Sequence, residues 1–523
     1  MIDPLKKRYR FRIVDPAYPA FNVYSFNAGR TTPLGPVCVA TAVNKMERWG
    51  AEVIDENNLR RYGPKSGSGG ADHEFLQKLR PADVVGLYGG LTSTIPRLYE
   101  IAKFYKNKGI TTIAGGHHFV DETIEEALSS GVDYIVIGEG EETIKELLRT
   151  LMKKGDLAKV QGIVYKQNGE IIRTPARKPI TDFDRLPLPD FSLVRCAKIV
   201  VYPVGRIRGC GMDCEFCAVK GKPRCASVER LMEQITNVVE TTKAKKFFVV
   251  DDLFGQQRSE TIRFCNMLRD YQKAIGVRLD VGVQIRLDMA KDTELLSAMR
   301  QAGISFIAIG YESPIEEELK VMKKHLDPEE MLYLTKIFRK AGFLIHGMFI
   351  FGYPMKAGVD FKMSEKERVK RFEQFINKAR LDTVQVMLPI PLPGTQLRER
   401  LKSENRIYPI EDVGWEYYDG NFPVFHPDEP MTSKEMQKST MEIMRGIFRF
   451  KNMFMVGINV LLTPGIILSP HNIKHGWRRW YRFWRQSLVR FGGWILMKKW
   501  SKAFYKGDFL DKLISAEKRL VKH

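Results

Sequence analysis

"KIVVYPVGRIRGCGMDCEFC", residues 198–217, places an apolar, β-branched run directly before three cysteines, Cys210, Cys214 and Cys217. The run predicts a strand, and the polar loop after it gathers three thiols at the carboxyl end of that strand. A disulfide needs an even number of cysteines, and a closed zinc site usually takes four ligands. Three thiols therefore indicate a metal centre with one open position. A zinc knuckle with a distant fourth ligand, or simply buried thiols, remains the structural alternative.

This strand is the first of six along the chain. Helical patterns separate the strands, such as residues 227–242, which a serine cap opens, and residues 328–342, which a glycine closes. The six strand-like runs are 198–205, 245–252, 279–285, 305–312, 344–352 and 383–390. Such βα units without a dinucleotide-binding fingerprint predict a (β/α)6 partial TIM barrel over residues 196–405. Its site lies at the carboxyl ends of the strands, where the cysteine loop is expected.

The sequence before the barrel has its own alternation of strands and helices. Over residues 10–153 it predicts a doubly wound, flavodoxin-like parallel sheet, assigned to residues 1–160. Three glycine-rich turns, at 87–94, 114–118 and 137–141, follow predicted strands, which is where open α/β sheets bind ligands. Each glycine alone is equally explained by a tight turn. A short hairpin and a proline-rich linker, residues 161–195, lead into the barrel, which makes the whole chain an α/β protein.

The cysteine spacing carries a family resemblance. CGMDCEFC, with Phe216 before the last cysteine, resembles the cluster motif of radical S-adenosylmethionine enzymes. The resemblance implies that Cys210, Cys214 and Cys217 bind a [4Fe–4S] cluster, and that S-adenosylmethionine chelates the open iron and yields a 5′-deoxyadenosyl radical. It further implies cofactor contacts from four side chains, Phe216, Gln284, Arg286 and Glu312. An ion pair between Arg286 and Glu312 at the barrel rim is an equally good explanation of those two residues.

The N-terminal domain resembles the cobalamin-binding domain of one branch of this family, and the resemblance covers roughly the first 420 residues. Small residues in the three turns would let a macrocycle approach the backbone closely. The residues expected to contact cobalamin are Thr92, Ser93, Thr94, Gly115, Gly116, Gly138 and Gly140. A DxHxxG element is absent, so we expect cobalamin to bind without a histidine ligand from that motif. His117 and His118 are more simply surface histidines on a turn.

The amino-acid composition indicates the cellular compartment and sets the C-terminal residues apart from the rest of the chain. Seven cysteines without an obvious pairing pattern and a charged N-terminus without a signal-peptide pattern favour a reducing, cytoplasmic setting. The net charge is +21, and residues 471–523 contribute 14 Lys and Arg against three Asp and Glu. Five of the seven tryptophans lie in this same stretch. The C-terminal extension, residues 406–523, is therefore predicted to be mainly helical and functionally distinct.

The tail carries a basic, aromatic, amphipathic pattern. At helical spacing Trp477, Trp480 and Trp484 share one face, with Arg478 and Arg482 beside it. This composition favours a helix in the interface of an anionic membrane, which would place the protein peripherally on the inner face. A helical lid packed on the barrel is the main alternative. Nucleic-acid binding is the weaker one, because no added β-barrel pattern is visible.

Together these features predict an enzyme that methylates an unactivated carbon of a hydrophobic substrate, such as a lipid, isoprenoid or tetrapyrrole. A one-electron donor such as flavodoxin or ferredoxin would reduce the cluster. The resemblance equally includes hopanoid-modifying enzymes and anaerobic oxidative cyclases of tetrapyrroles, so cyclisation or other C–C bond formation is the alternative. A non-catalytic cobalamin- or cluster-binding regulator with a nucleic-acid-binding tail is a distant third.

Overall fold

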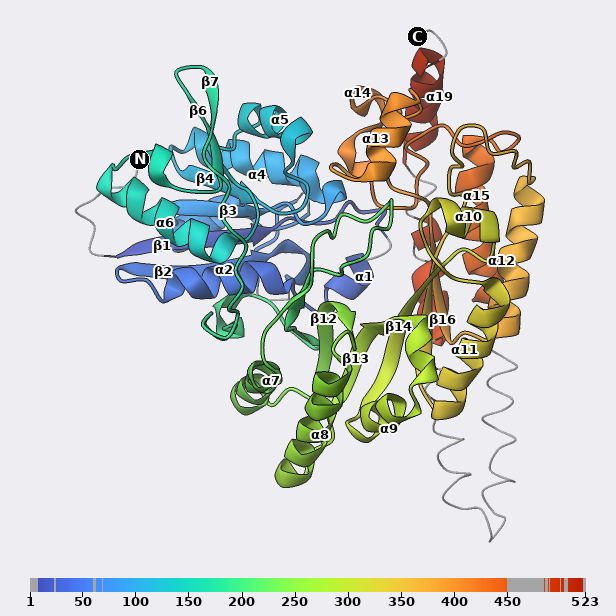
Figure 1. Ribbon diagram of the computed structural model, residues 1–523. Coiled ribbons are helices and arrows are strands. Elements are labelled where there is room, and N and C mark those ends of the chain that lie inside the picture. The colour runs from blue at the N-terminus through green and yellow to red at the C-terminus, as the bar shows by residue number, and fades with distance from the viewer. Residues whose placement is uncertain are drawn as a thin grey trace.

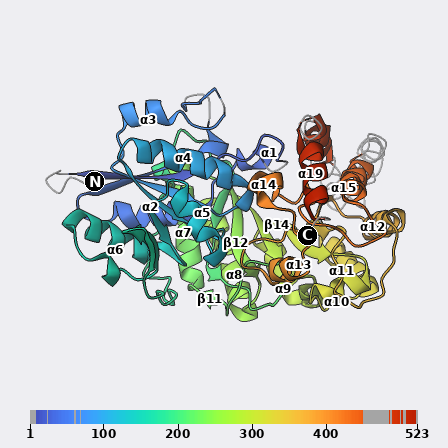
Figure 2. The same ribbon diagram turned by 90° about the horizontal axis from the view of Figure 1, so that it is seen from above.

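The computed structural model describes residues 8–22, 25–59, 63–67, 69–448, 484, 488, 490–498, 500–502 and 507–520. A mainly parallel sheet and a wholly parallel sheet organise this part of the chain, and helices from the C-terminal region pack beside the second sheet (Figure 1). Figure 2 shows the N-terminal sheet at one end of the molecule and α12, α15 and α19 at the other. The predicted α/β class, with an N-terminal doubly wound domain, a partial barrel and a helical C-terminal region, is confirmed.

The N-terminal sheet has eight strands in the order β7-β6-β5-β4-β3-β1-β2-β8. The strands are β1 (Tyr9–Asp15), β2 (Trp49–Asp55), β3 (Val84–Tyr88), β4 (Thr111–Gly115), β5 (Tyr134–Val136), β6 (Ile163–Gln167), β7 (Glu170–Arg173) and β8 (Val194–Arg195). All neighbours are parallel except β5–β6 and β6–β7. The segment expected as hairpin and linker, 161–195, thus adds three strands to this sheet, because its apolar residues extend the two edges.

Helices cover both faces of this sheet, as its near-continuous apolar strands require. Leu98, Ile101 and Ala102 of α4 pack with Val85 on one face, and Leu147 of α6 packs on the other. The helices are α1 (Ser25–Ala28), α2 (Leu34–Asn44), α3 (His73–Leu79), α4 (Ile95–Asn107), α5 (Ile124–Ser129) and α6 (Gly140–Lys153). The carboxyl ends of β3, β4 and β5 are left free for the glycine-rich turns.

The second sheet is wholly parallel and runs in the order β16-β15-β14-β13-β12-β9. Its strands are β9 (Tyr202–Val204), β12 (Lys246–Phe254), β13 (Asp280–Ile285), β14 (Ile304–Glu312), β15 (Leu344–Ile350) and β16 (Thr383–Met387). The first strand is shorter than its apolar run predicts. The amides of Val200 and Val201 instead donate to the carbonyl of Arg30, at 2.9 and 3.0 Å, and so join the run to the N-terminal domain.

The helices of the second sheet begin and end close to their predicted signals. The Ser227 side chain accepts a hydrogen bond from the amide of Arg230 at the start of α7, and Gly342 ends α11 with a φ of 92°. The helices are α7 (Val228–Thr242), α8 (Arg258–Ile275), α9 (Thr293–Gln301), α10 (Glu316–Val321), α11 (Pro328–Ala341), α12 (Glu365–Ala379), α13 (Gln396–Ser403), α14 (Ile410–Val413), α15 (Ser433–Ile447) and α19 (Phe509–Leu520). No helix among the described residues is both long and apolar enough to span a bilayer.

Two aspartates end neighbouring strands of the N-terminal sheet side by side. Asp15 of β1 and Asp55 of β2 are register partners, and both are buried. Burial raises the pKa of Asp55 to about 6, and burial together with the Asp55 carboxylate raises the pKa of Asp15. The Asp55 side chain also accepts hydrogen bonds from the amides of Asn57 and Asn58, which fixes the turn after β2.

This pair makes the stability of the chain fall as the pH rises. An unfolded Asp ionises near pH 4, whereas native Asp55 keeps its proton to about pH 6, so the unfolded state binds fewer protons in between. Asp55→Asn can still accept the two amide hydrogen bonds but cannot ionise. As the pH rises from 4.5 to 7.5, we expect its free energy of unfolding to increase by about 2 kcal/mol relative to that of the wild type. Melting curves at both pH values measure this gain. If the stabilities of the wild type and of Asp55→Asn changed equally between the two pH values, this prediction would be wrong.

Candidate functional site

The three cysteines lie in a loop that a small hairpin closes. Strands β10 (Ile207–Arg208) and β11 (Arg224–Cys225) pair antiparallel on either side of the loop. Inside it, Gly211 N donates to Gly221 O at 3.1 Å, and Cys217 N donates to Cys214 O at 3.2 Å. Gly209 has a φ of 91°, and a Cβ there would lie 2.8 Å from Lys222 O, so this close turn requires glycine. These backbone contacts fold the motif back on itself.

Cys214 is buried, and Cys210 and Cys217 are half-buried. Burial raises the pKa of the Cys214 and Cys217 thiols, while a hydrogen bond from Val219 N to Cys217 Sγ, at 3.4 Å, acts the other way at Cys217. Within the described residues no three His, Cys, Asp or Glu side chains gather closely enough for a single metal ion. In a [4Fe–4S] cluster each thiolate binds a different iron, so the sulfurs need not converge on one point.

The acidic pair after the second barrel strand supports the start of this loop. Asp251 Oδ1 accepts hydrogen bonds from the amides of Arg206 and Ile207, at 2.6 and 2.9 Å. Asp252 accepts one from Gly209 N at 2.6 Å, directly before the first cysteine. The sequence left the role of this pair open. The structure shows that both carboxylates fix backbone amides of the strand and turn that present Cys210.

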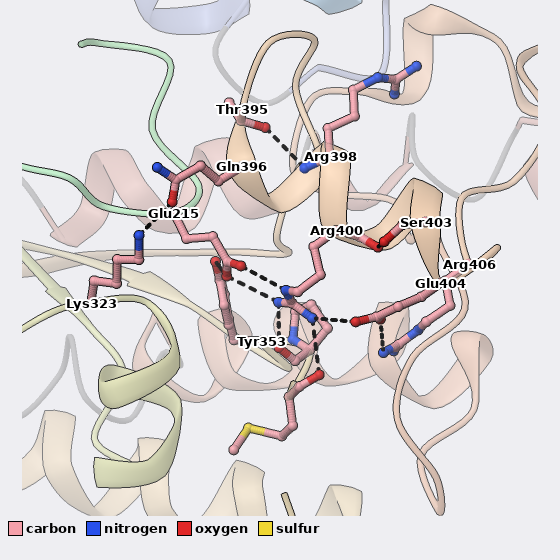
Figure 3. Close-up of polar contacts among 12 residues, drawn as sticks. Glu215, Lys323, Tyr353, Thr395, Gln396, Arg398, Arg400, Ser403, Glu404 and Arg406 are labelled. Carbon is pink, nitrogen blue, oxygen red and sulfur yellow. Dashed lines mark hydrogen bonds and ion pairs between the residues drawn. The ribbon is translucent and has the colours of Figure 1, made fainter. Parts of the chain in front are cut away.

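A third carboxylate holds the middle of the loop, and sequence reasoning missed it. Glu215, between two of the cysteines, is buried and accepts hydrogen bonds from the Tyr353 hydroxyl and from the guanidinium of Arg400 (Figure 3). Tyr353 follows β15, and Arg400 lies on α13. No pattern in one sequence could signal this cluster, because Tyr353 and Arg400 lie 138 and 185 residues after Glu215.

The side chains expected to contact S-adenosylmethionine divide into two groups. Phe216 packs edge-on against Tyr353, with ring centroids 6.2 Å apart, and Glu312 is buried at a bulge of β14. Gln284 and Arg286, at the end of β13, are exposed. Arg286 pairs with Asp288 and approaches Met212 Sδ of the cysteine loop at 3.4 Å.

Glu312 has a cationic partner that the sequence did not reveal. Lys324 Nζ lies 2.9 Å from Glu312 Oε1 and 6.0 Å from the centroid of the Phe216 ring. The interpretation of Arg286 and Glu312 as a rim ion pair is therefore wrong, because each pairs elsewhere. Burial alone would lower the pKa of Lys324, but the carboxylate of Glu312, together with the thiolate form of Cys214, holds it above its usual value. One cation and one carboxylate beside the cysteines are complementary to a zwitterionic ligand.

A cavity of about 760 Å³ lies between the two domains and is lined by residues of both. Its N-terminal wall includes Gly115, Gly116, Gly138 and Gly140, and its barrel wall includes the cysteine-loop residues Gly209, Ala218, Val219 and Lys220. Thr92, Ser93 and Thr94 form a buried single turn and are not among the lining residues. The glycine-rich edge and the cluster loop therefore face the same space.

The two adjacent histidines behave differently. His117 lines the cavity, whereas His118 is 1% exposed and packs edge-on against Trp415 with ring centroids 4.9 Å apart. The expectation that both are surface residues is wrong for His118. Burial lowers its pKa to about 3, so the ring is neutral, and its Nε2 is buried without a hydrogen-bond partner in the structure.

Ion pairs fix the barrel side of the cavity to the N-terminal side. Arg208 and Arg224, which flank the cysteine loop, both bind the carboxylate of Glu139, and Arg208 also binds Glu141. Burial alone would raise the pKa of Glu139, but hydrogen bonds from Arg224, the amide of Ile180 and Arg208 hold it below its usual value. The turn at 137–141 thus supplies both cavity-lining glycines and the carboxylates that hold the two domains together.

This arrangement agrees with two family models. Residues 204–364 match that of the radical SAM superfamily, and residues 28–148 match that of B12 binding domains. The chain therefore contains a radical SAM domain and a B12-binding domain. The uncharacterized methyltransferase PH0819 of Pyrococcus horikoshii is 28% identical, over 70% of this chain and 79% of the relative. The anaerobic magnesium-protoporphyrin IX monomethyl ester cyclase of Rubrivivax gelatinosus is 25% identical, over 72% of this chain and 68% of the relative.

A solved structure shares the whole architecture. The cobalamin-dependent S-adenosylmethionine radical enzyme OxsB, solved with aqua-cobalamin bound, superposes with a TM-score of 0.63 at 16% identity. The superposition covers 99% of this chain and 84% of OxsB. At this identity the likeness establishes the fold alone.

The two domains imply a [4Fe–4S] cluster, S-adenosylmethionine and cobalamin, and the residues present fit all three groups. Three thiols share one loop, as a cluster with an open iron requires. Lys324 and Glu312 lie beside the loop, where a zwitterion would be held. The glycine-rich edge borders a cavity in which a Cβ at position 138 would meet nothing within 4 Å. The sequence contains no DxHxxG element, so a histidine ligand from that motif is not part of this fit.

Two cavity glycines provide a matched test of the N-terminal wall. Gly116 has a φ of 130°, and a Cβ there would lie 2.5 Å from the backbone of Gly89, whereas Gly138 has a φ of 83° and open space. We expect Gly116→Ala to lower the melting temperature and the cobalamin retained after gel filtration. Gly138→Ala should cost only the backbone strain of about 1 kcal/mol in stability, but its Cβ would enter the cavity and should also lower the cobalamin retained. Absorbance of retained cobalamin and melting curves measure both, and full cobalamin retention in a folded Gly138→Ala would contradict the assignment.

Proposed function

We propose that this enzyme is a cobalamin-dependent methyltransferase that modifies an unactivated carbon of a hydrophobic substrate, such as a lipid, isoprenoid or tetrapyrrole. One observation carries the proposal. A single cavity is bounded by the glycine-rich edge of the B12-binding domain and by the loop that bears the three cysteines. Bound on that loop, the cluster with S-adenosylmethionine would supply a carbon-centred radical, and cobalamin held at the glycine-rich edge would supply the methyl group.

The protein's own part is to position these groups and to keep water away. Apolar side chains make up much of the wall between the two sets of residues, among them Leu87, Ile113, Val136 and Val219. Lys324 and Glu312 would orient the amino-acid part of S-adenosylmethionine through charge-assisted hydrogen bonds. Asp251 and Asp252 keep the first cysteine at the barrel mouth by holding the backbone before it. A flavodoxin or ferredoxin would deliver the electron that the cluster needs.

Oxidative cyclisation is the second candidate function. It is favoured by the relative from Rubrivivax gelatinosus, which is named a cyclase of magnesium-protoporphyrin IX monomethyl ester. The relative from Pyrococcus horikoshii is named a methyltransferase, and the similarity to it spans 79% of its length against 68% for the cyclase. The two reactions differ in their by-products, because only methyl transfer turns S-adenosylmethionine into S-adenosylhomocysteine.

The cluster assignment is tested on the full chain, reconstituted anaerobically with iron, sulfide and cobalamin. We expect Cys214→Ala to lose the brown absorbance and the formation of 5′-deoxyadenosine. Cys265→Ala, which changes a buried core cysteine of α8, should keep both. Full absorbance and 5′-deoxyadenosine in Cys214→Ala would show that the ligand assignment is wrong.

Methyl transfer is tested by incubation with methyl-labelled S-adenosylmethionine. A hopanoid, a polyprenyl lipid and magnesium-protoporphyrin IX monomethyl ester are supplied separately as probes. Label in a product together with S-adenosylhomocysteine supports methyl transfer. Ring closure without label supports the cyclase, and a chain that retains no cobalamin contradicts the methyl-transfer proposal.

We also propose that the tail docks on an anionic bilayer, as a peripheral contact from the cytoplasmic side. Trp477, Trp480, Arg478 and Arg482 lie outside the described residues, but Trp484 is 44% exposed. Leu488, Phe491 and Ile495 continue an exposed apolar stripe along the same stretch, at helical spacing. The excess of Lys and Arg in residues 471–523 complements an anionic lipid surface.

Vesicle binding tests this docking surface. We expect Leu488→Ser, Phe491→Ser and Ile495→Ser together to lower co-sedimentation with phosphatidylglycerol-containing vesicles about tenfold or more, because three apolar side chains leave the interface. Leu510→Ser with Ile514→Ser, an equally exposed apolar pair on α19, is the matched control and should bind as the wild type does. Unchanged binding of the triple variant, or equal loss in the control, would contradict the proposal.

A further inference from the structure

Helix α13 lies across the carboxyl side of the barrel and contacts the cysteine loop along one face (Figure 3). Gln396 Nε2 donates to Asp213 Oδ1 at 2.8 Å, and the amide of Leu397 donates to the carbonyl of Glu215 at 3.1 Å. One turn further on, Arg400 binds the Glu215 carboxylate. Both partners, Asp213 and Glu215, flank Cys214. The helix therefore holds the loop on each side of its most buried cysteine.

The contact at Glu215 is bidentate and shielded from water. Arg400 Nε lies 2.7 Å from Oε1 and Nη2 lies 3.1 Å from Oε2, and the Tyr353 hydroxyl donates to Oε2 at 2.7 Å. The exposed fractions of the Arg400 and Glu215 side chains are 14% and 5%. Arg400 is itself fixed by the carbonyls of Pro354 and Met355, at 3.0 and 3.1 Å. A buried pair with all its hydrogen bonds made in this way is rigid, and losing one partner leaves a buried charge.

The next face of α13 makes a different contact. Arg398 Nε lies 2.7 Å from Glu122 Oε1 of the N-terminal domain, and its guanidinium lies 5.3 Å from the centroid of the Trp415 ring. Arg398 and Arg400 are two residues apart and point to different partners (Figure 3). Substitutions at these two positions can therefore separate contact with the cysteine loop from the docking of the helix as a whole.

We propose that Glu215, Arg400 and Tyr353 act as positioning residues that fix the cysteine loop, and with it the cluster, against the S-adenosylmethionine side of the barrel. The inference rests on the cluster of the proposed function and not on its substrate. Glu215 directly follows a cluster cysteine in the chain, so its charge acts on the cluster at short range, and Arg400 neutralises it. Tyr353 joins the carboxylate to the Phe216 ring, which packs on it.

We call Glu215, Arg400 and Tyr353 together the clamp. Its charges should shift the midpoint potential of the cluster, which a purely structural role would not do. Glu215→Gln removes a negative charge directly beside a cluster cysteine, while Arg400 keeps its charge and its second partner Glu404, and should raise the midpoint potential of the cluster. Arg400→Gln leaves the carboxylate unneutralised and should lower it, because net charge near a cluster sets its potential. Both variants should weaken cluster retention against an iron chelator about tenfold, as loss of an outer-shell partner does. The double variant should lose no more than one of the singles, since both break the same interaction.

The experiment uses the full chain, reconstituted anaerobically with iron and sulfide. EPR-monitored redox titration, the EPR change on adding S-adenosylmethionine, and iron retained per chain are measured for each variant. Arg398→Gln is the matched control on the same helix and should keep the potential and EPR spectrum of the wild type. Tyr353→Phe removes only a hydroxyl, so it carries the test if a charge variant fails to fold, and it should change the EPR response to S-adenosylmethionine.

Opposite shifts of potential in the two charge variants, with an unchanged Arg398→Gln, support the clamp, as does an altered EPR response in Tyr353→Phe. Folded charge variants with wild-type potential and iron retention would overturn it, as would an Arg398→Gln that shifts the potential equally. A Tyr353→Phe with a wild-type response would overturn it where the charge variants do not fold. A wild-type chain that takes up no cluster overturns the proposed function and the clamp with it, whereas the other negative results overturn the clamp alone.

Discussion

A loop that carries three thiols and four charged side chains between residues 208 and 220 cannot hold its shape through a core of its own. It is held from outside by carboxylates, and the rest of the molecule is arranged to place them. Asp251 and Asp252 bind its backbone from the second barrel strand, and Glu139 and Glu141 bind the arginines at its base. Glu215, within the loop, reaches α13. Buried hydrogen bonds of this kind lose much if one partner is removed, so they specify one geometry.

The parts of the fold that rest on periodicity could be predicted from the sequence. Ser227 opens α7 and Gly342 closes α11 because both signals act within one turn of helix. The order of the barrel strands follows from right-handed βα units alone. The run at 198–205 was predicted too long, because its first residues bind Arg30, a contact between domains that local pattern does not contain.

For the site, spacing identified the cysteines and the glycine-rich turns, because each of these motifs lies within a short stretch of the sequence. Partners distant in the chain were not accessible. Lys324 pairs with Glu312 at a bulge of β14, and Arg400 binds Glu215 across 185 residues, and neither contact follows from a local pattern. His118 was expected on the surface because nothing in its turn shows that Trp415 of the C-terminal extension packs over it.

The short connector between the two sheets determines how either domain could be exchanged for another. Strand β8 ends at Arg195 in the N-terminal sheet and β9 begins at Tyr202 in the barrel, so six residues separate the sheets, and two of them bind Arg30. So short a connector allows the two sheets little freedom to move apart. The connector therefore restricts the distance between the glycine-rich edge of the first sheet and the cysteine loop of the second. Chimeras that exchange either domain should carry residues 194–204 with it, while the outlying edge hairpin of β6 and β7 is free to vary in length.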